Sequence, residues 1–184
     1  MAEKDSGILT TPDLVVLSLL AERAMHGYQL NAVLTARDVR DWAGISRPQV
    51  YYSLKKLANA KLIKPTHSEG SGGPERQEFA TTPAGLRALA EALEREDWAK
   101  QRSIPPFLTW MALSTHASRA AVRQQIIRRR EYLTTELARE RETLKSFENE
   151  VGEMVQVGGL MVELTIKHFE IELEWLDKVK KKLL

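Results

Sequence analysis

The chain of 184 residues is long enough for one domain, or for one small domain with an appendage. Its 43% apolar, 7% aromatic and 28% charged residues are typical of a helix-rich protein with a real core, and the lack of cysteine excludes disulfides, thiolate–zinc sites and cysteine nucleophiles. The net charge of +2 says little about partners. Because the sequence shows neither a signal-peptide core nor an apolar run of about 18 residues, we expect a soluble cytoplasmic protein without a membrane segment.

The first helical signals follow an N-terminal stretch, residues 1–8, that has no periodicity and that we expect to be mobile. Thr11 at the N-cap, Pro12 at the first helical position and Asp13 in the first turn are typical of a helix start. Leucines at helical spacing follow, with other apolar residues between them, which predicts a helix buried on more than one side. The pair His26-Gly27 then ends this helix.

Two further helices are predicted before residue 62. A short helix opens at Tyr28, and the next begins at Ser46-Arg47-Pro48, where a serine N-cap again precedes a proline. Trp42 lies in the polar segment between them, and we expect its ring to fill the core. Three apolar residues share one side of the later helix and mark its buried face: Val50, Leu54 and Leu57.

A two-stranded hairpin and a fourth helix complete the N-terminal part. Residues 62–67 have strand character, the glycine-rich segment 70–74 is a strong turn signal, and residues 77–81 return as the second strand. Thr82-Pro83 starts the fourth helix, whose regularly spaced leucines are Leu86, Leu89 and Leu93. Three helices, a hairpin and a helix in this order predict a winged helix-turn-helix, so the fold class is mainly α with a small β component.

The pair Pro105-Pro106 marks the predicted boundary between this domain, residues 9–104, and a helical domain, residues 105–184. A short apolar helix over 107–113 precedes a long helix capped by Ser118. Gly158-Gly159 is predicted to interrupt the helical run before the last segment.

The last segment carries the most regular apolar pattern of the chain. Its residues step by four and three, as in the seam of a coiled coil: Val162, Ile166, Phe169, Leu173 and Leu176. Because such a seam is too apolar to leave in water, we expect a two-fold homodimer in which residues 107–184 of two chains wrap each other. The alternative is an intramolecular hairpin between residues 118–152 and 160–182.

Five short motifs together resemble the PadR family of bacterial transcriptional regulators. They are Ala24–Leu30 (AMHGYQL), Val50–Leu57 (VYYSLKKL), Leu62-Ile63, Gly72-Gly73-Pro74 followed by Arg76, and Thr82–Gly85 (TPAG). The resemblance covers residues 9–95, and the C-terminal helices look like the dimerisation region of the longer, virulence-activator-like members. It implies a homodimeric DNA-binding repressor, in some members released by a small aromatic effector. Tyr52 stands where the family usually has proline.

Charge is unevenly distributed around the predicted third helix. Residues 42–68 include no acidic side chain but five basic ones: Arg47, Lys55, Lys56, Lys61 and Lys64. Such a local field favours a surface that faces a polyanion, the alternative being a solvated helix face, and for Lys61 and Lys64 ordinary solvation. For a two-fold dimer we expect an inverted-repeat operator in double-stranded DNA, with half-sites about one helical turn or a multiple apart.

The N-terminal part of a recognition helix usually approaches the bases. We therefore predict base contacts for Gln49, which can pair with adenine, and for Tyr52. The predicted phosphate contacts at this helix are Arg47, Lys55 and Lys56, and Ser46 at the helix start is a further candidate for contacting DNA.

Three residues outside that surface, or at its edge, are further candidates for contacting DNA. Tyr28 follows a glycine at a helix start, where free amides can bind phosphate. Tyr51 either contacts DNA or packs beneath its helix with Tyr28. Arg76 at the wing tip is a candidate minor-groove or phosphate contact that Glu75 and Glu78 oppose.

Aromatic residues gather around the predicted domain boundary: Trp98, Phe107 and Trp110. A flat aromatic ligand stacked there would be able to change the spacing of two recognition helices. The alternative is that these rings pack the core between the domains.

Catalytic residues do not converge in this sequence. His168 and Glu172 lie at i and i+4, which favours a surface pair over half a metal site, and the glycine-rich segment lacks the Lys-Ser/Thr of a P-loop. We therefore expect no enzyme activity, metal or cofactor. The competing function is a helical adaptor that uses a winged helix to dock on proteins, because fold alone does not settle function.

Overall fold

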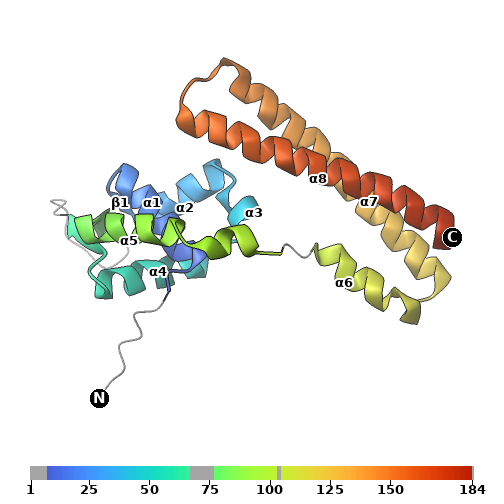
Figure 1. Ribbon diagram of the computed structural model, residues 1–184, viewed down its shortest axis with the longest axis horizontal. Coiled ribbons are helices and arrows are strands. Elements are labelled where there is room, and N and C mark those ends of the chain that lie inside the picture. Colours follow the sequence, from blue (N-terminus) through green and yellow to red (C-terminus); the bar gives the residue numbers. More distant parts are fainter. Residues whose placement is uncertain (1–7, 67–76, 103–104, 184) are drawn as a thin grey trace. The chain divides into compact units, whose positions relative to one another are not determined.

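The computed structural model describes residues 8–66, 77–102 and 105–183 (Figure 1). The predicted mobile stretch 1–8 therefore lies, except for Ile8, outside the described residues. The chain divides into two compact units, residues 1–102 and 103–184, and the division falls two residues before the predicted boundary. The fold class is confirmed, because the described residues are mostly helical and include one three-stranded antiparallel sheet.

The first unit places five helices around a small sheet (Figure 1). The helices are α1 (Thr11–Glu22), α2 (Gly27–Ala36), α3 (Val39–Ala43), α4 (Arg47–Asn59) and α5 (Pro83–Leu93), and a 3-10 turn follows at Glu96–Lys100. The strands are β1 (Met25–His26), β2 (Ile63–Thr66) and β3 (Glu78–Thr81), in the spatial order β1-β3-β2. The β2–β3 pair is the predicted hairpin, with Ile63 opposite Thr81. Strand β1, which pairs Met25 with Phe79, was not predicted.

The start of α1 lies one residue earlier than its sequence signals predict. Thr10, and not Thr11, is the N-cap, and Pro12 occupies the second helical position. Asp13 determines where the helix begins, because its Oδ2 accepts hydrogen bonds from Thr10 N (2.9 Å) and Thr10 Oγ1 (2.8 Å). An acid at the third helical position thus satisfies the backbone of its own N-cap, as in a capping box.

The core of the first unit joins α1, α2, α4 and the sheet. Its fully buried members include Leu17, Leu30, Leu34, Val50 and Leu57. The prediction that Trp42 fills this core is wrong, because its side chain is 55% exposed. The flanking residues Val39 and Ile45 are buried instead, and Gly44, with φ 63°, ends α3 between Trp42 and Ile45.

Helix α5 packs through its small residues and not through the predicted leucine face. Leu86 and Leu93 are each at least half exposed, and only Leu89 contacts the core. Gly85 is the point of closest approach, since a Cβ there would lie 2.1 Å from the carbonyl oxygen of Leu62. Thr82 anchors the same helix, because its Oγ1 accepts a hydrogen bond from Gly85 N (3.1 Å).

The second unit is a helical hairpin with a short helix beside it. It consists of α6 (Pro106–Leu113), α7 (Arg119–Ser146) and α8 (Glu153–Leu183), with 3-10 turns at Ser114–His116 and Phe147–Asn149. Ser118 caps α7 as predicted, and α7 and α8 run antiparallel, side by side (Figure 1). The predicted break at Gly158-Gly159 is wrong, because both glycines lie inside α8 and the chain turns at residues 147–152.

The predicted coiled-coil seam faces α7 of the same chain. Leu176 is only 1% exposed and clusters with Val122, Ile126 and Leu133 of α7. The other seam residues are buried or half-buried on α8: Val162, Ile166, Phe169 and Leu173. Within one chain the seam packs on α7, as in the intramolecular hairpin that was the alternative interpretation, and the role of these residues in dimerisation stays a prediction.

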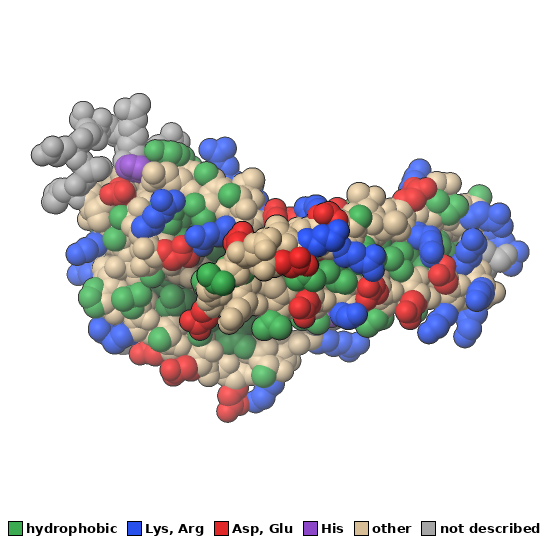
Figure 2. All heavy atoms as spheres, turned by 90° about the horizontal axis from the view of Figure 1, so that it is seen from above, with side chains coloured by type: hydrophobic (Ala, Val, Ile, Leu, Met, Phe, Trp, Pro, Cys, Tyr) green, Lys and Arg blue, Asp and Glu red, His purple; other side chains and the backbone are tan. Residues whose placement is uncertain are grey.

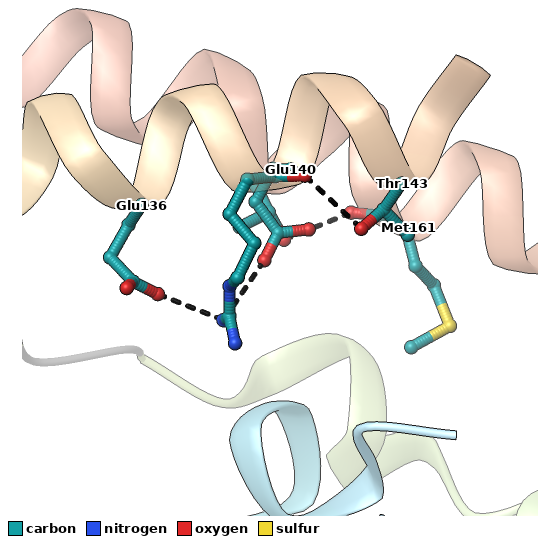
Figure 3. Close-up of polar contacts among 6 residues, drawn as sticks. Glu136, Glu140, Thr143 and Met161 are labelled. Atoms are coloured by element: carbon teal, nitrogen blue, oxygen red, sulfur yellow. Dashed lines mark hydrogen bonds and ion pairs between the residues drawn. The ribbon is translucent and has the colours of Figure 1, made fainter. Parts of the chain in front are cut away.

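Charged and apolar side chains share the outside of the hairpin. Basic and acidic side chains alternate over the visible face of this unit (Figure 2). On α7, Arg139 Nη2 lies 2.8 Å from Glu136 Oε2, and its backbone carbonyl accepts a hydrogen bond from Thr143 Oγ1 (3.2 Å), beside Met161 of α8 (Figure 3). Among the helices of the described residues, we find none with the length and apolar character to cross a bilayer.

The close approach at Gly85 yields a stability prediction. Gly85→Ala should lower the free energy of unfolding by about 1–3 kcal/mol, because the new methyl group meets the backbone of Leu62 and neither side can yield cheaply. The control is Gly159→Ala inside α8, where a Cβ meets no atom and should stabilise the helix by up to about 1 kcal/mol. Urea unfolding followed by circular dichroism compares the two, and a neutral Gly85→Ala would contradict the contact.

Candidate nucleic-acid interface

Helix α4 has one face in the core and the other in solvent. Val50, Leu54 and Leu57 are buried as predicted, and Ser46 is the N-cap of the helix. The opposite face is exposed and carries four of the nine predicted DNA-contacting side chains: Arg47, Gln49, Tyr52 and Lys55. Tyr52 is 71% exposed, which is unusual for so large a ring. The helix therefore presents a polar and aromatic surface from a rigid, core-anchored element.

Gln49 serves the helix start as well as this surface. Its Oε1 accepts hydrogen bonds from Ser46 N and Ser46 Oγ, both at 2.7 Å. The amide oxygen is thus already occupied, whereas pairing with adenine through both amide atoms requires it as an acceptor. While the cap is intact, Gln49 offers only its amide N–H groups, which suit acceptors such as guanine O6 or thymine O4.

Tyr51 packs between two helices. A Cβ on Gly27 would lie 2.9 Å from Cε1 of the Tyr51 ring, so the absence of a side chain at Gly27 gives that ring its place. Tyr51 is half-buried against the core, and the structure favours the packing interpretation of this residue. Its neighbour is Gly27 at the start of α2, and not the ring of Tyr28 as the sequence suggested.

Tyr28 is exposed at the start of α2. Its ring stacks on His26, with centroids 5.5 Å apart and planes at 11°. His26 is the N-cap of α2, and its backbone N–H donates to Gln29 Oε1 (2.8 Å). Tyr28 is thus held beside a helix N-terminus, the position from which the sequence predicted a phosphate contact.

Lys56 forms an ion pair with an acidic side chain of the first unit. Its Nζ lies 2.6 Å from Oδ2 of Asp13, whose side chain is 1% exposed. Burial raises the pKa of Asp13, but the hydrogen bonds from Lys56 and Thr10 outweigh this effect and hold the pKa below its ordinary value. One charge of the acid-free stretch is therefore neutralised from inside the protein. The sequence did not reveal this pair because Asp13 lies 43 residues earlier, on α1.

The wing is described only in part. Lys64 is exposed on β2, Lys61 is exposed just before it, and Thr66 Oγ1 donates to Glu78 Oε2 (2.7 Å) across the hairpin. Arg76 and Glu75 lie outside the described residues. The predicted contact of the wing tip with DNA stays a prediction.

The three aromatic residues proposed for an effector fall in two units. Trp98 belongs to the first unit, where its Nε1 donates to the carbonyl oxygen of Ala92 (2.8 Å) and its ring is partly exposed. Phe107 and Trp110 of α6 stack on each other, with centroids 5.0 Å apart, and pack on the core of the hairpin. Within the described ranges, no three side chains are grouped so that they could hold a metal ion.

Comparisons with known proteins agree with this geometry. The model of the "Transcriptional regulator PadR-like family" matches residues 16–91, which include α4 and both strands of the hairpin. This domain of the chain therefore resembles the PadR-like family of transcriptional regulators. The family is one of regulators and not an enzyme class. A search of curated proteins found no match.

Three solved structures show how far the likeness to the PadR family extends. PadR of Bacillus subtilis in complex with operator DNA is 16% identical, with a TM-score of 0.71 over 95% of this chain and 100% of that chain. The same protein in complex with p-coumaric acid is 15% identical, with a TM-score of 0.67 over 95% and 96%. A PadR-like regulator from Bacillus cereus is 17% identical, with a TM-score of 0.68 over 100% of both chains. The shared fold thus includes the C-terminal helices as well as the DNA-binding domain.

Proposed function

We propose that this PadR-like regulator is a sequence-specific repressor that binds an inverted-repeat operator as a homodimer. The observation that carries the proposal is the exposed face of α4, which holds Tyr52, Gln49 and Lys55 above a buried apolar face. A protein-docking module does not need a helix surface free of acids, whereas a surface that approaches phosphates does. In the proposed complex Tyr52 and the amide N–H groups of Gln49 read bases, and Arg47, Lys55 and Tyr28 contact phosphates.

Dimerisation in this proposal uses a second stripe of α8, separate from the buried seam. The stripe consists of exposed apolar residues at heptad spacing: Met154, Val157, Met161, Leu164 and Ile171. At about 100° per residue their directions centre roughly 130° from the centre of the seam that faces α7. Two such stripes from two chains would cover each other and give the two-fold symmetry that an inverted repeat requires.

An effector in this proposal is a flat aromatic compound that stacks on Trp98. The rings of Phe107 and Trp110 already stack on each other, so of the three predicted residues Trp98 has the most available face. The structural likeness to a PadR that binds p-coumaric acid supports a phenolic acid as the first compound to test.

The DNA-binding proposal predicts different effects for Lys55 and Tyr52. Lys55→Ala should weaken all sequences alike and lower the slope of log affinity against log salt by about one, because one phosphate loses its cation. Tyr52→Ala should instead lower the preference for the operator by roughly 1–3 kcal/mol. Gel shifts on the gene's upstream region and on random DNA measure both, with Lys178→Ala in α8 as the control. Equal affinity of the unaltered protein for both DNAs would contradict the proposal and favour protein docking.

The dimer proposal predicts that charge on the stripe prevents association. Leu164→Glu combined with Ile171→Glu should give a folded monomer with weak operator binding, because buried carboxylates in the interface lack partners. Glu163→Lys, which changes a charge one residue off the stripe, should remain a dimer. Sedimentation velocity at micromolar concentration separates the two, and an unaltered protein that sediments as a monomer refutes the dimer.

The effector proposal predicts that Trp98→Leu abolishes the response to phenolic acids. In the unaltered protein, titration should quench tryptophan fluorescence and release the operator over the same concentration range. Trp42, Trp110 and Trp175 remain in the variant, so the remaining tryptophan fluorescence reports whether the fold is intact. Quenching without release would show binding without regulation and contradict the proposed role.

A further inference from the structure

One oxygen atom joins the start of α1 to the recognition helix α4. Oδ2 of Asp13 accepts hydrogen bonds from Thr10 N, Thr10 Oγ1 and Lys56 Nζ, at 2.9, 2.8 and 2.6 Å. The carboxylate lies beneath the protein surface, while the lysine side chain reaches it from α4 and keeps about a third of its own surface exposed. Ser53, one turn earlier on α4, is also buried.

The geometry separates two neighbouring lysines. Lys55 is exposed and makes no ion pair in the described part of the chain, so its ammonium is available to a phosphate. If the ammonium of Lys56 moved from Asp13 to a phosphate, the carboxylate would be left buried without its cation. Breaking a buried pair from one side is costly, because the remaining charge has lost both water and partner. The free energy of DNA binding would have to offset that cost. The neighbouring Lys55 offers a phosphate the same charge without breaking an ion pair.

We propose that Asp13 and Lys56 are positioning residues, which fix α4 against α1 so that its exposed face meets the bases in one orientation. The inference rests on the proposed DNA-binding function and deepens it, because it assigns the lysine to specificity and not to phosphate neutralisation. The apolar contacts of Val50 and Leu57 bury α4 but are tolerant of small rotations and shifts. A charged hydrogen bond of defined length is directional and limits such movement.

The test compares three single variants of the full-length protein by binding to operator and random DNA over a range of salt concentrations. Lys56→Met and Asp13→Asn each remove one charge of the pair and keep the side chain close to its original size. Lys55→Met is the matched control, one residue away on the same helix. The readouts are the salt slope and the ratio of operator affinity to random-DNA affinity, which a purely structural role in a still folded protein would not change.

We expect Lys56→Met and Asp13→Asn to keep the salt slope and to lower the affinity ratio by roughly tenfold, the scale of one lost base contact. Lys55→Met should lower the slope by about 0.9 and leave the ratio unchanged. The inference is overturned if Lys56→Met flattens the slope as Lys55→Met does. It is equally overturned if Asp13→Asn strengthens binding to all DNA, because Lys56 would then be a phosphate contact that Asp13 holds back.

The double variant Asp13→Asn/Lys56→Met covers the case in which Lys56→Met does not fold. Removing both charges leaves no unpaired buried ion, so its urea midpoint should exceed that of Lys56→Met while its affinity ratio stays low. A double variant with the ratio of the unaltered protein would overturn the inference. Failure of the proposed function looks different, because the unaltered protein itself would then show a ratio of one.

Discussion

The buried carboxylate of Asp13 links two helices of the DNA-binding unit. It caps the N-terminus of α1 by accepting a hydrogen bond from Thr10, and it accepts another from the ammonium of Lys56 on α4. A buried ion of this kind adds little net stability compared with apolar packing, but it strongly disfavours alternative arrangements that leave it unpaired. The apolar residues around it supply the burial, and the ion pair selects one arrangement among those that would bury them equally well.

Glycine makes the complementary contribution at two contacts. Gly27 leaves space for the ring of Tyr51, and Gly85 lets α5 approach the carbonyl of Leu62 at a distance that no side chain permits. The contact at Gly85 is with the backbone of Leu62, whereas the contact at Gly27 is with the aromatic ring of Tyr51. The exposed face of α4 is consequently carried by a framework whose helices are fixed at their points of nearest approach.

Local signals were sufficient to predict much of this framework. The cap at Ser46, the buried side of α4 and the β2–β3 hairpin each depend on residues a few positions apart, and all were found where the sequence placed them. Contacts between distant residues were not predictable in this way. The Asp13–Lys56 pair joins two helices that are distant in the sequence. Strand β1 is only two residues long. Helix α5 makes its closest contact through Gly85 and not through the predicted leucine face. The exposed face of α4 was predictable, but the engagement of Gln49 in its own cap was not.

Periodicity also left one question open that only the fold answers. The seam from Val162 to Leu176 shows that α8 has an apolar side but not which helix covers it, and the structure shows that α7 of the same chain does. The second stripe, with Met154 and Ile171 at its ends, is interrupted by His168 and is therefore a weaker pattern than the seam. A helix with two apolar sides can pack against two partners, and sequence alone does not show which side each partner covers.

The packing of the seam within one chain determines how two chains can associate. Because Leu176 and its neighbours are already covered within one chain, the hairpin completes its core before it meets a second molecule. Any association through the second stripe is then a bimolecular step between chains that are already folded, and its extent depends on concentration. Subunits joined in that way can separate and exchange without unfolding. The fraction of associated protein would then rise with the total concentration, so the amount synthesised would set how much of the regulator is assembled.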